Sequence, residues 1–288
     1  MVPSLVLRTA LGKHDHVKPL RDGRVISSRV TLDFVDIEPL PKAFRQMVRG
    51  DDLDVAELAV VTHLLAHHFQ RPLKGLAIPL WSRLPHTNLV CPEDSALRSP
   101  SDLDGRRVGV RAYAQTSGVW VRGVLAHEYG VDLNSILWGT MEDAHLPDYV
   151  DPPNTKRYTP PPGLRELMLQ GEFEAIMGER IVDPAGIRTV IPGATNAAHD
   201  WMRRTGIHPI NHILTVKRDW LAAHSWLAGE LMDMFVKARE LAIADGAKPP
   251  PPYGFDANAA SLQRCMQFSA EQAVTPFLYD VREMYEPV

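Results

Sequence analysis

The segment from Arg111 to Gly118 has the composition of an anion-binding corner. It reads Arg-Ala-Tyr-Ala-Gln-Thr-Ser-Gly, which predicts the end of a strand, a loop of small residues and the start of a helix. The first turn of a helix has unpaired backbone N–H groups and the positive end of the helix dipole, so Gln115, Thr116 and Ser117 suit a carboxylate or a phosphate. Arg111 can add a charge-assisted contact. Ordinary helix capping explains the same residue types equally well.

Two histidines lie in extended runs next to prolines. His86 belongs to Ser-Arg-Leu-Pro-His-Thr-Asn (residues 82–88) and His212 to His-Pro-Ile-Asn-His (208–212). Histidine exchanges a proton near neutral pH, which makes both side chains candidates for acid–base chemistry. If the two runs are antiparallel neighbours, His86 and His212 approach each other. The alternative is that each histidine bonds a backbone carbonyl at a corner of the chain.

Other acid and histidine groupings carry weaker signals. Glu142 precedes a histidine by three positions in Glu-Asp-Ala-His (residues 142–145). Such a grouping can bind a metal or fix a histidine tautomer, but it is also common in a solvated loop. His63 and His67 are four residues apart, but the acid of the HExxH motif is absent. Asp54 and Glu57 form a weak pair near a predicted strand end.

Several function classes lack their sequence signals. The chain has no P-loop, no GxGxxG and no GxSxG, so nucleotide binding and an α/β-hydrolase site have no support. Cys91 and Cys265 are the only cysteines and are far apart, which excludes a disulfide framework and a thiolate zinc site. The 31 Lys and Arg against 35 Asp and Glu give a net charge of −4, so no overall positive field recruits nucleic acid or an acidic membrane.

The elements that must position these residues alternate between strand and helix. This alternation predicts an α/β fold with an open, mostly parallel sheet covered on both faces. Apolar or alternating runs predict strands at residues 4–8, 30–37, 76–80, 107–111, 135–139, 173–178 and 213–216. Helical patterns cover residues 43–49, 55–68, 118–129, 164–169 and 195–204, followed by a mainly helical last quarter. Proline is abundant, with 24 residues, and marks a surface connection at 151–163.

A length of 288 residues fits two lobes. The runs at residues 85–91 and 209–216 are interpreted as two crossover strands, which gives a first lobe of residues 1–90 and 209–288 and a second lobe of 91–208. Ligands would then bind in a cleft between the lobes, at the carboxyl ends of the strands. Two lobes joined in series are the alternative.

Residues 54–226 resemble the 4,5-dihydroxyphthalate decarboxylases, enzymes with the fold of type II periplasmic solute-binding proteins. The similar stretches are PLWSRLPHTN (79–88), GVRAYAQTSGVWVRGVLAHEY (109–129), WGTMEDAHLPDYVDPPNTKR (138–157) and GIHPINHILTVKRDWLAAHSW (206–226). Residues 13–17, Lys-His-Asp-His-Val, depart from the Asp/Tyr/Arg-containing loop expected in this family. The departure bears on the substrate, because this loop is expected to line the cleft.

The resemblance implies loss of CO2 from 4,5-dihydroxyphthalate or a close analogue, giving 3,4-dihydroxybenzoate without an organic cofactor. Such a reaction needs a general acid over the ring and an anion clamp for the carboxylate that stays. We assign the acid to His212, with His86 as its partner, and the clamp to Arg111 with the amides of Gln115, Thr116 and Ser117. Further candidates are an apolar wall of Trp81 or Trp120 and four charged residues, Arg83, Arg122, Glu57 and Glu142.

Alternatives stay open. The fold also suits a solute-binding protein that delivers a small anionic or aromatic ligand to an ABC-type transporter. A decarboxylase that uses a divalent metal held by His86, His212 and a carboxylate is a second alternative to the metal-free route. We expect a small aromatic carboxylate as the partner, no nucleic acid or membrane, and a homodimer if the chain associates. The first residues lack the pattern of an export signal and no run suits a transmembrane helix, so the expected location is cytoplasmic.

Overall fold

The computed structural model describes residues 4–50, 52–159, 162–178 and 184–288, which belong to two compact α/β units. The first unit comprises residues 1–82, 210–263 and 279–288, and the second comprises 83–209 and 264–278. The predicted fold class, mixed α/β with two lobes of which one interrupts the other, is confirmed.

The first unit is built on a six-stranded sheet in the order β12-β4-β11-β3-β1-β2. Its strands are β1 (Leu5–Ala10), β2 (Val30–Phe34), β3 (Val55–Ala59), β4 (Leu73–Ser82), β11 (Ile210–Lys217) and β12 (Tyr285–Glu286). β1 is parallel to β2 and β3, and β12 is parallel to β4. β11 runs antiparallel between β3 and β4. The sheet therefore brings the end of β1, the middle of β3 and the start of β11 together.

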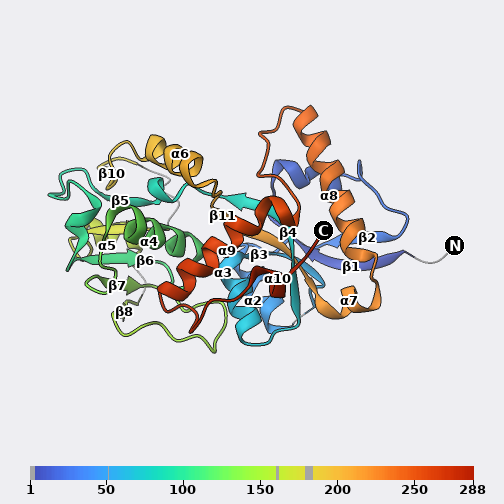
Figure 1. Cartoon of the computed structure of the whole chain (residues 1–288), viewed down its shortest axis with the longest axis horizontal. Coiled ribbons are helices and arrows are strands. Elements are labelled where there is room, and N and C mark those ends of the chain that lie inside the picture. Colours follow the sequence, from blue (N-terminus) through green and yellow to red (C-terminus); the bar gives the residue numbers. More distant parts are fainter. Residues whose placement is uncertain (1–3, 51, 160–161, 179–183) are drawn as a thin grey trace. The chain divides into compact units, whose positions relative to one another are not determined.

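Helices pack against this sheet (Figure 1). They are η1 (Asp15–Val17), α1 (Lys18–Arg21), α2 (Pro41–Arg49), α3 (Val60–His68), α7 (Arg218–Ala223), α8 (Leu227–Ala244) and α10 (Val281–Met284). α8 presents Leu227, Leu231 and Phe235 at a spacing of four, so they lie on one helix face. That face joins alternate residues of β4, such as Leu76 and Ile78, in one buried cluster. Burial of these side chains stabilises the sheet that carries the candidate acid His212 on β11 and its neighbour Glu57 on β3.

Residues 55–68 were predicted as one helix, and that prediction is wrong. The structure divides them into the strand β3 and the helix α3. All five residues of β3 are buried between β1 and β11, so the strand shows no alternation of apolar and polar side chains. A short, fully buried strand cannot be distinguished from a buried helix by periodicity.

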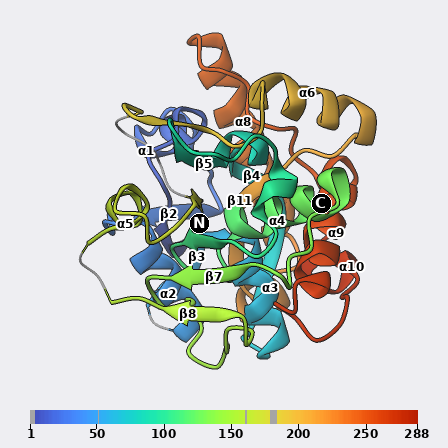
Figure 2. The same cartoon turned by 90° about the vertical axis from the view of Figure 1, so that its left-hand side faces the viewer.

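The second unit has a six-stranded sheet in the order β10-β5-β9-β6-β7-β8. Its strands are β5 (Leu89–Pro92), β6 (Arg107–Val110), β7 (Leu137–Thr140), β8 (Thr155–Arg157), β9 (Ala175–Met177) and β10 (Ile187–Thr189). β6 is parallel to β7 and β9, and β8 pairs with β7 at the outer edge (Figure 2). β5 is antiparallel to β9 and β10. β8 lies within the proline-rich connection at 151–163, of which residues 160–161 are outside the described ranges.

The helices of the second unit are η2 (Pro85–Asn88), η3 (Pro100–Leu103), α4 (Thr116–Tyr129), α5 (Leu164–Leu169) and α6 (Ala194–Thr205). α4 is buried over its first ten residues. A Cβ at Gly123 would lie 2.0 Å from the Phe268 ring, so glycine permits a close contact with α9 (Phe255–Glu271). This contact helps to fix the direction in which the amino end of α4 points within the unit.

The carboxy-terminal stretch is divided differently from the sequence expectation, which placed all of 209–288 in the first lobe. Residues 264–278 belong to the second unit. Phe268 packs edge-on against Trp120, with ring centroids 5.7 Å apart, and Gln272 hydrogen-bonds the Arg122 guanidinium. Side chains on the last turns of α9 thus complete the core around α4, a long-range contact that the local sequence pattern does not encode.

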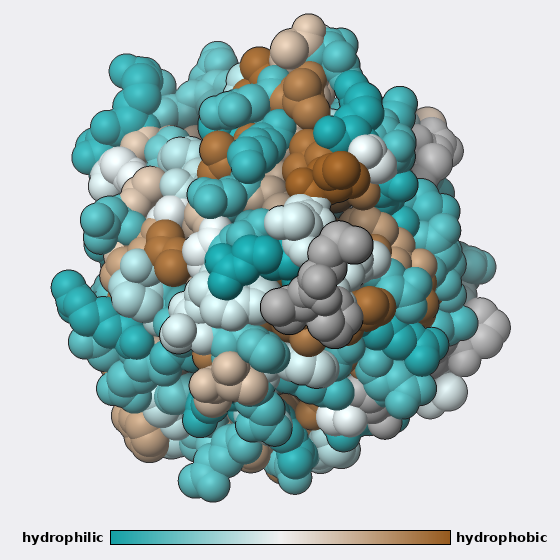
Figure 3. Space-filling model, turned by 90° about the vertical axis from the view of Figure 1, so that its right-hand side faces the viewer, coloured by the Kyte–Doolittle hydropathy of each residue, from teal (hydrophilic) through white to brown (hydrophobic). Residues whose placement is uncertain are grey.

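The surface near the described start of β1 is mostly hydrophilic, with hydrophobic side chains scattered over it (Figure 3). Val6, in β1, and Ile26 are among the exposed hydrophobic residues. Scattered apolar side chains are normal on protein surfaces. Within the described ranges, no helix has both the length and the hydropathy needed to span a bilayer.

Candidate functional site

A buried carboxylate on β3 gathers two histidines in the first unit. Glu57 is 0% exposed, and its Oε2 accepts hydrogen bonds from the Gly12 backbone N–H at 2.8 Å and from His14 Nε2 at 2.9 Å. Its Oε1 lies 2.6 Å from Nδ1 of His212 and 3.1 Å from Nε2 of His14. Three separate segments therefore meet here. β3 carries Glu57, the loop after β1 supplies Gly12 and His14, and β11 supplies His212.

The backbone explains why these groups meet. β11 pairs with β3 so that Leu214 stands opposite Glu57 and His212 opposite Ala59. β1 ends at Ala10 beside β3, and the following loop brings the N–H of Gly12 to the carboxylate. A Cβ at Gly12 would lie 2.9 Å from Glu57 Oε2 and 2.6 Å from His14 Nε2, closer than real contacts allow. A side chain at residue 12 would therefore displace Glu57 or His14 from this arrangement.

The protonation of this cluster follows from its contacts. Burial alone would raise the pKa of Glu57, but the hydrogen bonds from His14 and His212 outweigh it and hold the pKa well below its ordinary value. An ionised carboxylate only accepts hydrogen bonds, so Nε2 of His14 and Nδ1 of His212 carry protons. The opposite nitrogens, Nδ1 of His14 and Nε2 of His212, make no hydrogen bond within the described residues.

Aromatic rings surround the two histidines. The His212 ring lies 5.1 Å from Phe44, edge-on, and 4.7 Å from Trp81, which pairs with it in the sheet register. Trp81, predicted as an apolar wall, is thus placed beside the predicted acid. His14 stacks on His16 at 5.3 Å with a 9° angle between the rings. Burial lowers the pKa of His16 to about 4, with a further contribution from His14, so His16 is neutral at pH 7.

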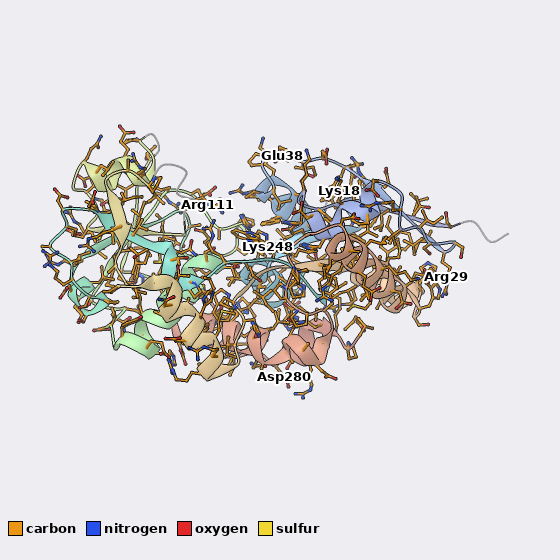
Figure 4. The ribbon with its side chains drawn as sticks, turned by 90° about the horizontal axis from the view of Figure 1, so that it is seen from above. Lys18, Arg29, Glu38, Arg111, Lys248 and Asp280 are labelled. Carbon is orange, nitrogen blue, oxygen red and sulfur yellow. The ribbon has the colours of Figure 1, made fainter. Side chains whose placement is uncertain are left out.

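The second unit carries the predicted anion-binding corner. α4 begins at Thr116 and has Gln115 at its N-cap position, where no side-chain capping bond forms in the described structure. Thr116 and Ser117 are buried in the first turn of this 14-residue helix. Arg111 follows β6 (Figure 4), and its Nε lies 2.6 Å from Oε1 of Glu142 in an ion pair that is about one-third exposed. Arg111 and Glu142, both predicted as site residues, therefore contact each other.

Two further side chains meet at the carbonyl of Gly178. Gln115 Nε2 donates to this oxygen at 2.9 Å, and Arg83 Nη1 donates to it at 3.3 Å and to Asn88 Oδ1 at 2.8 Å. Gly178 has a positive φ of 76°, and a Cβ there would lie 2.8 Å from Gln115 Oε1. The structure thus brings two predicted residues, Arg83 and Gln115, to one backbone oxygen near the start of α4.

Arg122 and Trp120 are core residues of the second unit. Arg122 is 0% exposed and donates from Nε to Gln272 Oε1 at 2.8 Å and from Nη2 to the Tyr113 carbonyl at 2.6 Å. Its guanidinium lies over the Tyr113 ring, and burial lowers its pKa. Trp120 packs between Phe268 and Trp201. The contacts of both side chains lie within the core of the second unit, which gives them structural roles in place of the predicted binding roles.

His86 occupies an aromatic pocket in the second unit. It is 2% exposed, and its ring lies 5.8 Å from Trp201 and 6.4 Å from Tyr129. Burial lowers the pKa of His86 to about 4, so it is neutral at pH 7. The hydrogen-bond partner of the predicted acid His212 is Glu57.

His14 is the member of the cluster that sequence reasoning missed, and Glu57 was ranked only as a secondary candidate. The available signal was the pair of histidines in residues 13–17, directly after a predicted strand and within the stretch that departs from the expected family pattern. Within the described part of the chain, no group of three or more His, Cys, Asp or Glu side chains has an arrangement that could hold a metal ion.

Comparisons with known proteins give two curated relatives and many structural neighbours. No family model matches the chain. A 4,5-dihydroxyphthalate decarboxylase from Comamonas testosteroni is 30% identical over 257 residues, which cover 83% of this chain and 76% of that protein. One of the same name from Pseudomonas putida is 29% identical over 195 residues, 61% of this chain and 71% of that protein. The periplasmic aliphatic sulphonate binding protein of Escherichia coli superposes with a TM-score of 0.64 at 16% identity, covering 98% and 97% of the two chains.

Proposed function

Because this chain belongs to the 4,5-dihydroxyphthalate decarboxylase family and is a carboxy-lyase, we propose that it converts 4,5-dihydroxyphthalate, or a close hydroxylated aromatic dicarboxylate, to 3,4-dihydroxybenzoate and CO2. The observation that carries the proposal is the hydrogen bond of His212 to the buried, ionised Glu57. It supplies an oriented proton donor, which is the group that this reaction needs most.

The reaction requires a proton on the ring carbon before CO2 departs. Direct loss of CO2 would leave an unstable aryl anion, whereas protonation of the carbon that bears the carboxylate lets the carbon–carbon bond break with the ring as product. Electron release from the hydroxyl para to that carbon assists the protonation. A general acid held over the ring therefore provides the main acceleration, typically about 10²- to 10⁴-fold.

His212 acts as this acid through Nε2. Glu57 holds Nδ1 at 2.6 Å, which fixes the ring orientation and stabilises the imidazolium form. Trp81 and Phe44 give the His212 ring an apolar surround. An apolar wall disfavours the charge of the departing carboxylate and favours its conversion to neutral CO2.

The retained carboxylate is assigned to the corner at the start of α4. The first turn at Thr116 and Ser117 suits an anion because it combines N–H donors with the helix dipole, whereas the predicted Gln115 amide donates to the Ala112 carbonyl at 3.0 Å. Arg111 adds a charged donor. Since Glu142 engages Nε of Arg111, the substrate carboxylate is expected to bind through the Nη atoms. No organic cofactor is part of this proposal.

The test is a direct assay of the purified protein with 4,5-dihydroxyphthalate, following both CO2 and 3,4-dihydroxybenzoate. His212→Asn keeps a donor at the position of Nδ1 and removes Nε2, so kcat is expected to fall about 100-fold or more with the fold intact. His199→Asn, at an exposed histidine of α6, is the matched control. Absence of turnover with every hydroxylated phthalate would overturn the function, and near-normal turnover of His212→Asn would overturn the acid assignment.

Metal analysis of the active protein addresses the metal-dependent alternative in the same experiment. Activity that follows the content of a divalent metal, and is lost when a chelator removes that metal, would favour the alternative route. Full activity in metal-free protein would favour the direct route through His212.

A further inference from the structure

We propose that His14 is a second catalytic residue, the base that takes the proton of the ring hydroxyl para to the departing carboxylate while His212 protonates the ring carbon. This inference rests on the proposed function and adds a base to it. Its foundation is that one buried carboxylate, Glu57, holds both imidazoles, through Nε2 of His14 and Nδ1 of His212.

Charge balance assigns one proton to the pair of histidines. Glu57 is fully buried and ionised, and a buried charge requires a compensating partner. One imidazolium makes the cluster neutral, whereas two would leave an excess positive charge beside the buried, neutral His16. The arrangement therefore favours one imidazolium, which is an acid, and one neutral imidazole, which is a base.

The contacts indicate which histidine is which. His212 makes the shorter bond to Glu57, 2.6 Å against 2.9 Å for His14, as expected for the charge-assisted member. His14 makes the longer bond and stacks on His16, which is neutral.

The free nitrogens then have the required character. Neutral His14 carries its proton on Nε2 toward Glu57, so its Nδ1 has a lone pair and can accept a proton. The His212 imidazolium has a proton on Nε2, which it can donate. An acid and a base thus belong to the same cluster, as protonation of the carbon and deprotonation of the hydroxyl require.

The step needs no reactant besides one proton from solvent. The O–H bond of the hydroxyl breaks and its proton goes to Nδ1 of His14, while the oxygen electrons move into the ring. The para carbon forms a bond to the proton from Nε2 of His212. The bond to the carboxylate then breaks, its electrons restore the aromatic ring, and CO2 leaves. His14 returns its proton to the oxygen, and His212 regains one from solvent, so one proton is consumed for each CO2 released.

The test compares His14→Gln with His212→Asn across pH. A glutamine amide can occupy the position of Nε2 and keep a donor to Glu57, but it offers no basic nitrogen in place of Nδ1. We measure kcat and KM from pH 6 to pH 10.5, with thermal unfolding and calorimetric binding of 3,4-dihydroxybenzoate as controls of folding. His199→Gln, which makes the same substitution at an exposed histidine of α6, is the matched control.

At pH 7, His14→Gln is expected to lower kcat about 100-fold with little change in KM. The deficit should shrink as the pH passes the ionisation of the ring hydroxyl, near about 10 for an ordinary phenol, because a phenolate needs no base. The kcat of His212→Asn should stay low at every pH, since this variant lacks the acid throughout, and it should not rise as the hydroxyl ionises. A purely structural role of His14 would not produce a pH-dependent recovery.

Four results overturn the inference. If His14→Gln keeps the wild-type kcat at pH 7, or loses the same factor at every pH while the wild type is active, His14 is not the base and the proposed function stands. If the wild-type protein decarboxylates no hydroxylated phthalate, the proposed function fails and this inference fails with it. Loss of 3,4-dihydroxybenzoate binding in His14→Gln would instead assign His14 to substrate binding.

Discussion

Replacement of Glu57 by glutamine tests the cluster at its centre. Glutamine has nearly the same shape as glutamate, so Glu57→Gln removes one charge and converts one acceptor oxygen into an amide donor. In the native protein that carboxylate accepts from three donors, the Gly12 N–H, His14 Nε2 and His212 Nδ1. At least one of these donors must therefore face an NH2 group in the variant, or a histidine must change its tautomer.

The expected loss of activity follows from that mismatch. A histidine that turns its lone pair toward the new amide presents the wrong tautomer to the substrate, and the imidazolium of His212 loses its counter-charge. A carboxylate-to-amide change beside a catalytic histidine lowers kcat about 10⁴-fold in the serine-protease example, where the tautomer is reversed. We expect a fall in kcat of about 10²- to 10⁴-fold for Glu57→Gln, measured with 4,5-dihydroxyphthalate at pH 7.

Stability should change as well, and with a definite pH dependence. Hydrogen bonds to a charged group contribute about 1.5–3 kcal/mol each, and a buried donor without an acceptor is unfavourable by about 1–3 kcal/mol. Since glutamine keeps part of the bonding, the free energy of unfolding should fall by about 2–4 kcal/mol at pH 7. The folded-state pKa of Glu57 is depressed, so this stabilisation is present above the unfolded pKa of about 4.3 and is lost as the pH falls toward the folded pKa.

Urea unfolding of wild type and Glu57→Gln at pH 7 and at pH 3.5 measures this effect. The difference between them should be large at pH 7 and smaller at pH 3.5. Glu240→Gln, at an exposed position of α8, controls for the loss of a surface charge. If Glu57→Gln unfolds at the same urea concentration as wild type and keeps kcat within threefold, the account of a charged, three-donor carboxylate is refuted.

Two further substitutions test the flanking parts of the site. Arg111→Gln should raise KM about 10- to 100-fold, because a charge-assisted contact to a carboxylate contributes about 1.5–3 kcal/mol. The control variant Arg203→Gln, at an exposed arginine, should leave KM unchanged. An equal KM in both variants would show that Arg111 does not bind the substrate carboxylate. Gly12→Ala should lower the free energy of unfolding by about 1–3 kcal/mol and reduce kcat, because its Cβ would lie 2.6 Å from His14 Nε2. Gly229→Ala in α8 has open space and should stabilise slightly, so equal unfolding of the two alanine variants would contradict the packing argument.

The anion-binding corner could be predicted from sequence because its signals are local. A strand, a loop of small polar residues and a helix ended by glycine follow each other between residues 107 and 130, and the structure has β6, the loop and α4 in that order. The inward direction of Arg122 and Trp120 could not be predicted. The first ten residues of α4 are all buried, so no exposed polar face indicates which side of the helix faces the core.

The cluster around Glu57 was harder to predict because its parts are distant in the sequence. Residues 55–59 read as the start of a helix, and a glutamate in a helix is ordinarily a solvated residue. Only the pairing of β3 between β1 and β11 buries that carboxylate and brings His212 to it, and such a pairing follows from tertiary structure. The position of His14 depends further on a loop whose path the residue types do not determine.

The location of His14 bears on substrate choice. Residues 13–17 are the stretch that departs from the pattern expected for the family, and the structure places part of it at Glu57. In the proposed reaction His14 acts on a ring hydroxyl, whereas the groups assigned to the carboxylate lie at the start of α4. If His14 has this role, a change in this loop is expected to alter the recognition of the hydroxyls and to leave the carboxylate-binding groups unchanged. By this reasoning, the departure in sequence concerns the hydroxyl pattern of the substrate, while the requirement for an aromatic carboxylate is set elsewhere in the chain.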